Sequence, residues 1–111
     1  MNNVVLIGRL TADPELRQTQ DGRPVASFSL AINRGRDQDG NDLGADFQRV
    51  TVWGRQAETC GQYLNKGDQC AVHGRLQTGK YQNRSGDTVY TTDVIAQRVE
   101  FLGKAGTGNG N

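Results

Sequence analysis

The stretch DFQRVTVWGRQAETCGQYLNKGDQCAVHGRLQ, residues 46–77, decides the fold class because its hydrophobic period changes twice. Residues 46–54 alternate with a period of two, which predicts a strand. Residues 56–65 carry a helical stripe at positions i, i+3, i+4 and i+7, formed by Ala57, Cys60, Gly61 and Leu64. Residues 68–77 return to a period of two. The stretch therefore predicts a strand, a short helix and another strand.

The residues after the helical stripe resemble a helix end. Lys66 places a cation in the expected last turn, and Gly67 can adopt the left-handed conformation of a cap. Two strands precede the deciding stretch, at Val4–Leu10 and Val25–Asn33. In the second of these, alternation places one set of residues on the core side: Ala26, Phe28, Leu30 and Ile32.

The remaining segments are turns, loops and one more strand. Asp13–Leu16 and Asp21–Pro24 carry turn signals, and residues 35–45 form a polar loop. Residues 79–87, centred on Asn83-Arg84-Ser85-Gly86, predict the turn of a long hairpin. Residues 88–102 form the last strand, expected to be bent or bulged because their alternation is imperfect.

Five strands with a helix between the third and the fourth are the element order of an OB-fold, a five-stranded Greek-key barrel. The expected class is thus all-β with one short helix. Another small barrel or an α+β sheet has a similar pattern. We expect residues 1–103 to form the domain and residues 104–111 to form a flexible tail rich in glycine and asparagine. Removing Gly103–Asn111 should therefore change neither folding nor binding.

Bulk properties limit the functional classes only weakly. The 111 residues fit one domain, and thirteen basic against twelve acidic residues leave a net charge of +1. Overall charge therefore gives no reason to expect a nucleic-acid partner, and only the placement of charges can. The sequence has no apolar run of membrane-spanning length and no signal peptide at its start, which favours the cytoplasm.

Strand 46–54 carries the strongest functional signal. Alternation places Val50 and Val52 on one face, with Phe47, Arg49 and Trp53 on the other. If the valines face the core, two aromatic rings and a guanidinium stand outside, where bases can stack on the rings. In the alternative interpretation, Phe47 and Trp53 pack beneath a loop or against another subunit.

Basic residues near these aromatic rings extend the expected DNA-binding surface. They are Arg34, Arg36 and Arg55, together with Lys80 and Arg84 on the hairpin, where the aromatic Tyr81 follows Lys80. OB-folds bind oligonucleotides with this part of the sheet and its flanking loops. A solvated charge is the usual explanation for any single surface arginine, so the prediction depends on the clustering of cations around aromatic rings.

Other constellations do not form a convincing catalytic, metal or cofactor site. The acidic loop at Asp37, Asp39, Asp42 and Asp46 resembles a calcium loop, but it lacks the bidentate glutamate. Cys60 and Cys70 fit no metal spacing, and we interpret them as buried hydrophobic residues rather than as a disulfide or redox pair. We therefore expect no enzymatic activity, no metal and no cofactor.

The only histidine, His73, lies on the outward face of strand 68–77. Alternation puts Ala71, His73 and Arg75 on this face, opposite an inward set made of Cys70, Val72 and Leu76. A domain this small gains stability from oligomerising. We therefore expect the outward face to meet its own copy in a closed symmetric assembly.

Several motifs in order resemble the bacterial single-stranded DNA-binding protein family: Asn3–Leu10, Asp13–Arg17, Tyr63–Gly67, Gly74–Thr78 and Tyr90–Val94. The similarity extends over about residues 1–103. It implies a homotetramer, cytoplasmic and associated with the nucleoid, that binds single-stranded DNA in replication, repair and recombination. The family's stacking aromatics match Phe47, Trp53 and Tyr81. Its basic contacts match Arg17, Arg49, Arg55 and Lys80.

The sequence departs from this family in two places. Relatives often carry an aromatic where this chain has Gly35-Arg36, so one stacking position is expected to be missing. Relatives usually end in an acidic tip that recruits partner proteins, whereas this sequence ends at Gly108–Asn111. That ending argues against recruitment through the tail. A dimeric restart accessory resembling primosomal replication protein N, and a small hydrolase or metal-dependent enzyme, are the alternative hypotheses.

Overall fold

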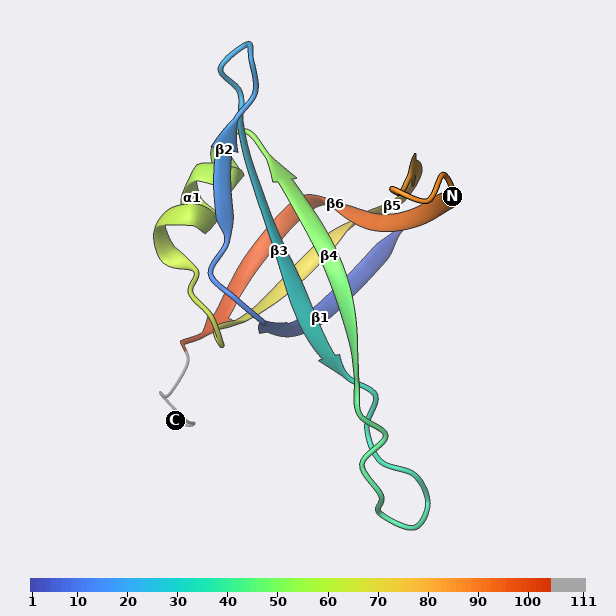
Figure 1. The fold of residues 1–111 in the computed structure, drawn as a ribbon. Coiled ribbons are helices and arrows are strands. Elements are labelled where there is room, and N and C mark those ends of the chain that lie inside the picture. Colours follow the sequence, from blue (N-terminus) through green and yellow to red (C-terminus); the bar gives the residue numbers. More distant parts are fainter. Residues whose placement is uncertain (105–111) are drawn as a thin grey trace.

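The computed structural model describes residues 1–104 and contains six strands and one helix in that range (Figure 1). The elements are β1 (Val4–Leu10), β2 (Glu15–Gln18), β3 (Pro24–Asn33), β4 (Ala45–Trp53), α1 (Arg55–Tyr63), β5 (Gln69–Gln82) and β6 (Thr88–Gly103). The all-β class with one short helix is confirmed. The expected flexibility of residues 105–111 lies outside the described residues.

The strands form one sheet in the order β1-β5-β6-β4-β3-β2. β1 also pairs with β3, through Arg9 with Ala31 and Leu10 with Leu30, so five of the strands close on themselves. The β4–β6 pairing is parallel, and the other strand pairs are antiparallel. The helix follows the third strand of the closed set, as in the predicted OB-fold.

One strand, β2, was not predicted from the sequence. The sequence interpretation assigned a turn to Asp13–Leu16, where β2 begins. β2 lies at the sheet edge, where Leu16 pairs with Ala26 of β3. Its four residues are all exposed, so they show no hydrophobic alternation. Leu16 also approaches the helix, because a Cβ added at Gly61 would lie 2.9 Å from its Cδ2. Contacts distant in sequence therefore define this strand.

The core lies inside the closed part of the sheet, beneath α1. Val50 and Val52 of β4 are completely buried, as are Ala26 and Leu30 of β3. The predicted core-facing residues are therefore correct, but β3 is buried on both faces near its start, because Val25 and Ser27 on the other face are only 5% exposed. Leu76 is the exception: it was expected to share the buried side of Cys70 and Val72, but it is 41% exposed. Leu76 pairs with the buried Val94 of β6, but the pairing of β5 with β1 ends at Gly74, so one side of Leu76 is left uncovered by a strand.

The helix is shorter than the sequence pattern suggested. It ends at Tyr63, and Leu64 is already extended and buried. Lys66 and Gly67 do not cap it, because they belong to the following turn, where the Gly67 amide donates to the Leu10 carbonyl at 2.8 Å. The last turn of α1 contains no basic residue of its own. Ala57, Cys60 and Leu64 face the core, so the helix covers one end of the barrel.

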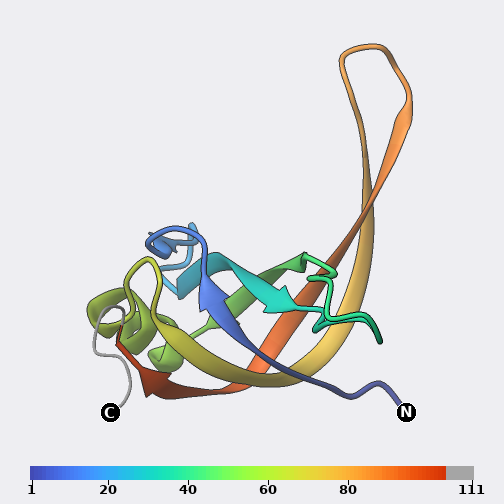
Figure 2. The same ribbon diagram turned by 90° about the horizontal axis from the view of Figure 1, so that it is seen from below.

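β5 and β6 form a long hairpin that protrudes from the barrel (Figure 2). The pairing continues to Gln82 and Thr88, and the Asn83 side chain accepts the amides of Ser85 and Asp87 in the turn. The register shifts twice, so β6 is bulged as expected. At one shift, a Cβ on Gly74 would lie 2.1 Å from the Ile95 carbonyl oxygen, which makes glycine necessary there.

Candidate nucleic-acid interface

The outer face of β4 presents two exposed aromatic side chains. Phe47 is 71% exposed and Trp53 is 38% exposed. Both lie opposite small or aliphatic residues of β3, Ala31 for Phe47 and Val25 for Trp53. No loop of the described chain buries them, which removes one part of the alternative interpretation. A β-strand rises about 3.3 Å per residue, so the two rings lie roughly 20 Å apart along the strand.

The Trp53 end of this face carries a cation that the sequence analysis did not single out. The guanidinium carbon of Arg23 lies 4.9 Å from the centroid of the Trp53 ring. Arg23 belongs to the β2–β3 turn, which the sequence marked only as a turn. No sequence signal pairs two residues thirty positions apart. Arg17 of β2 lies in register with Val25, so it shares this face, and it forms an ion pair with Glu15 at 3.6 Å.

The predicted arginines of β4 and its flanking segments differ in the ion pairs and hydrogen bonds that they form in the free protein. Arg49 is exposed between the two aromatic rings and lies 4.0 Å from the Asp93 carboxylate. Arg55 is exposed at the start of α1. By contrast, Arg34 forms an ion pair with Asp46 at 2.6 Å, and this carboxylate raises the pKa of the guanidinium. Arg36 donates to the Gly40 carbonyl at 3.0 Å.

The sequence interpretation treated Lys80 and Tyr81 as a cation–aromatic pair, but the hairpin places them on opposite faces. Lys80 and Tyr81 are consecutive in β5, so their side chains point to opposite faces. Lys80 lies across from Tyr90, which is 77% exposed, and Tyr81 lies across from Val89. Tyr90 is therefore the aromatic neighbour of Lys80, and the sequence analysis missed it. Arg84 is exposed at the turn.

The carboxylates of Asp37 and Asp42 in the acidic loop accept hydrogen bonds from other residues of the same loop. Asp37 accepts the backbone amides of Asp39 and Asn41 and the side-chain amide of Asn41, and these bonds lower its pKa. Asp42 accepts the Gly44 amide at 2.8 Å. Among residues 1–104, no group of three or more histidine, cysteine or acidic side chains is arranged to hold a metal ion.

The two cysteines are buried and free. Burial raises the pKa of Cys60 to about 11. Burial, followed by the nearby Cys60 and Asp68, raises the pKa of Cys70 to about 12. Both thiols are therefore neutral at physiological pH and are poor nucleophiles. Along the same described range, no helix is long and apolar enough to cross a membrane.

A second exposed face lies over β1 and β5. Val5 is 66% exposed and Ile7 is 52% exposed, and they lie across from His73 and Ala71. The His73 ring forms a hydrogen bond with the Asn3 side chain. The fold thus brings two of the three residues predicted for an oligomer contact beside a pair of exposed aliphatic side chains. The third, Arg75, lies beyond the bulge, opposite Ile95.

A closed five-stranded barrel with a helix after its third strand defines the class of the fold, an OB-fold, here with exposed aromatic rings and an interleaved arginine on one face. Comparison with known proteins is more specific. The chain belongs to the single-strand binding protein family, whose pattern it matches over residues 1–102. The family resemblance noted from the sequence motifs is therefore confirmed. Membership of this family argues against the alternative hypothesis of a hydrolase or metal-dependent enzyme.

Three relatives illustrate the similarity. The chain is 49% identical over 102 residues to single-stranded DNA-binding protein 1 of Staphylococcus aureus strain Mu50, covering 92% of this chain and 65% of the relative. It is 47% identical to single-stranded DNA-binding protein A of Bacillus subtilis, covering 100% and 65%. A Bacillus cereus single-stranded DNA-binding protein is 47% identical over 92% of this chain and 60% of its own. The chain thus spans less than two thirds of each relative.

Proposed function

We propose that this protein binds single-stranded DNA with little sequence preference and protects it during replication, repair and recombination. The observation that carries the proposal is the outer face of β4, where Phe47 and Trp53 are exposed with Arg49 between them. Every base has a π-face, so aromatic stacking tolerates all sequences. Family membership supports the same function.

In the proposed mechanism, bases stack on Phe47, Trp53 and Tyr81. The backbone phosphates contact the exposed cations around these rings: Arg17, Arg49, Arg55, Lys80 and Arg84. Phosphate contacts supply salt-dependent affinity without reading the base sequence. Arg34 and Arg36 contribute less, because each must first leave a partner that it has in the free protein, the Asp46 carboxylate for Arg34 and the Gly40 carbonyl for Arg36. Tyr90, beside Lys80, is a further stacking position.

We also propose that the protein acts as a homotetramer associated with the nucleoid in the cytoplasm. Support comes from the exposed aliphatic side chains of Val5 and Ile7 beside Ala71 and His73. Arg75, at the end of the same strand face, completes the proposed contact. An isologous contact across a two-fold axis would cover this patch with its own copy.

The test is a fluorescence titration with oligothymidylate of increasing length, because Trp53 is the only tryptophan. Stacking on the indole should quench the emission strongly, and duplex DNA of equal length should quench it far less. The solution mass is measured on the same sample. Absence of quenching and of any retention on single-stranded DNA would refute the proposed function. A stable dimer that binds DNA weakly would favour the restart-accessory alternative.

A further inference from the structure

The β2–β3 turn holds the backbone of Arg23 in a fixed position. Its carbonyl accepts the Thr19 amide at 2.9 Å, and its own amide donates to the Thr19 hydroxyl at 3.1 Å. Gly22, with a positive φ of 85°, closes the turn by donating to the Thr19 carbonyl. The next residue, Pro24, accepts the Gly54 amide at 2.9 Å. This last bond ties the turn directly to the end of β4.

The side chain of Arg23 covers the ring on which a base is proposed to stack. Its guanidinium carbon lies 4.9 Å from the Trp53 centroid. Val25, directly across from Trp53 in the register, is only 5% exposed, so the sheet side of this pair is already packed. Within residues 1–104, no carboxylate lies at ion-pairing distance from Arg23. The hydrogen bond from Thr19 and, to a smaller extent, the charge of Arg23 lower the pKa of Asp21 in the same turn, but the guanidinium itself contacts the aromatic ring.

We infer that Arg23 and Trp53 form an exchange site for one nucleotide of single-stranded DNA. A base displaces the guanidinium from the indole, and the released guanidinium then binds the adjacent backbone phosphate. This inference rests on the proposed function. Base stacking on an aromatic ring is stronger than a solvent-exposed cation–π contact, so the base can displace the cation. A guanidinium binds phosphate through two parallel hydrogen bonds, and the fixed turn keeps it within reach.

The inference assigns Arg23 two opposing effects that depend differently on salt. As a cover it competes with the base at every salt concentration. As a phosphate ligand it helps only where electrostatic attraction is strong. Each phosphate neutralised on a single strand contributes about −0.7 to the log–log slope of affinity against salt. Between about 50 and 200 mM salt, the wild type should therefore lose roughly 2.5-fold more affinity than a variant without this cation.

The experiment measures oligothymidylate affinity across that salt range for wild type, Arg23→Ala and Arg23→Lys. Arg23→Ala should have a shallower slope by about 0.7, bind more weakly at low salt and equal or exceed the wild type at high salt. Arg23→Lys keeps the charge and should keep the wild-type slope. Both variants should remain folded by circular dichroism, because the turn is held by backbone bonds and Thr19.

Two results would overturn the inference. If Arg23→Ala keeps the full wild-type slope, the guanidinium does not reach phosphate. If Arg23→Ala abolishes quenching of Trp53 by DNA, Arg23 supports the stacking surface rather than covering it. Both readouts require that the wild type binds and is quenched. Failure of the wild type itself would instead refute the proposed function, so the two failures are distinguishable.

Discussion

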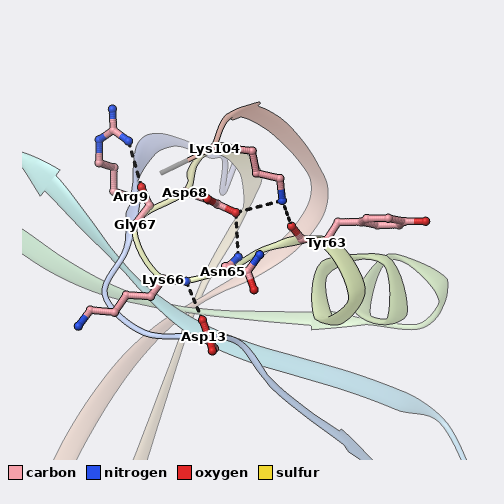
Figure 3. Close-up of polar contacts among 8 residues, drawn as sticks. All are labelled: Arg9, Asp13, Tyr63, Asn65, Lys66, Gly67, Asp68 and Lys104. Carbon is pink, nitrogen blue, oxygen red and sulfur yellow. Dashed lines mark hydrogen bonds and ion pairs between the residues drawn. The ribbon is translucent and has the colours of Figure 1, made fainter. Parts of the chain in front are cut away.

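The carboxylate of Asp68, whose side chain is 3% exposed, lies 3.3 Å from the ammonium of Lys104 (Figure 3). Asp68 also accepts the Asn65 amide at 2.9 Å, and Lys104 donates to the Tyr63 carbonyl at the last residue of α1. One lysine after the last strand therefore neutralises a buried acid. It also supplies the positive charge that the C-terminal turn of this helix lacks.

This contact changes the expectation for truncations. Lys104→Met should lower the free energy of unfolding by about 1 kcal/mol, because a buried carboxylate loses its cation while part of the pair is open to solvent. Deleting residues 105–111 keeps Lys104 and should leave stability unchanged. Removal from Gly103 onward should therefore destabilise the protein, contrary to the sequence expectation. Urea unfolding of the three variants checks this, and equal midpoints would contradict the role of Lys104.

Replacing either exposed ring of β4 should weaken DNA binding without unfolding the barrel. Trp53→Ala and Phe47→Ala should each cost roughly 1–3 kcal/mol of binding free energy. Tyr63→Ala is the matched control, because Tyr63 is an aromatic residue that is 55% exposed at the end of α1 and is not among the proposed DNA contacts. Titration calorimetry with oligothymidylate and thermal unfolding separate the two effects. A large loss of stability in the β4 variants would mean that the rings serve packing.

Arginines that form an ion pair in the free protein should contribute less to DNA binding than unpaired arginines. Arg55→Ala should make the log–log salt slope shallower by about 0.7. Arg34→Ala should change it less, because Arg34 is paired with Asp46 in the free protein at 2.6 Å. The slope measured for both variants over the same salt range tests this ranking. Equal changes would show that the Arg34–Asp46 pair opens fully on binding.

The cysteines should be unreactive until the barrel unfolds. Burial raises the pKa of Cys60 to about 11 and that of Cys70 to about 12, above the ordinary value of 9.0. A raised folded-state pKa means that stability is fully present below about pH 9 and is lost as the pH rises toward the folded values. Ellman's reagent at about pH 8 should label both thiols only in denaturant. Rapid labelling of the native protein would contradict their burial.

The aliphatic patch on β1 provides a test of the proposed assembly. Ile7→Glu places a charge at a position that is 52% exposed in the single chain. It should leave the subunit folded and dissociate the oligomer, because an unpaired charge is costly inside an interface. Thr11→Glu, an exposed position after β1, is the control. Sedimentation of both variants with unchanged mass would exclude this face as the contact.

The sequence by itself determined which residues of β4 point outward. The alternation of two valines with Phe47, Arg49 and Trp53 has only one arrangement that buries the valines, and the hydrophobic effect selects it. The position of the helix between β4 and β5 and the long hairpin also followed from local period and turn residues. These features depend on neighbours within a few positions, which the sequence presents directly.

Tertiary structure alone decided the features that depend on distant partners. Periodicity carries no information about pairs such as Arg23 with Trp53 or Asp68 with Lys104, which long-range strand pairing brings together. The same holds for β2, whose exposed residues become a strand only by pairing with β3. Leu76 shows the converse limit: it has the inward parity of Cys70 and Val72, but it stays 41% exposed because β1 stops pairing with β5 at Gly74.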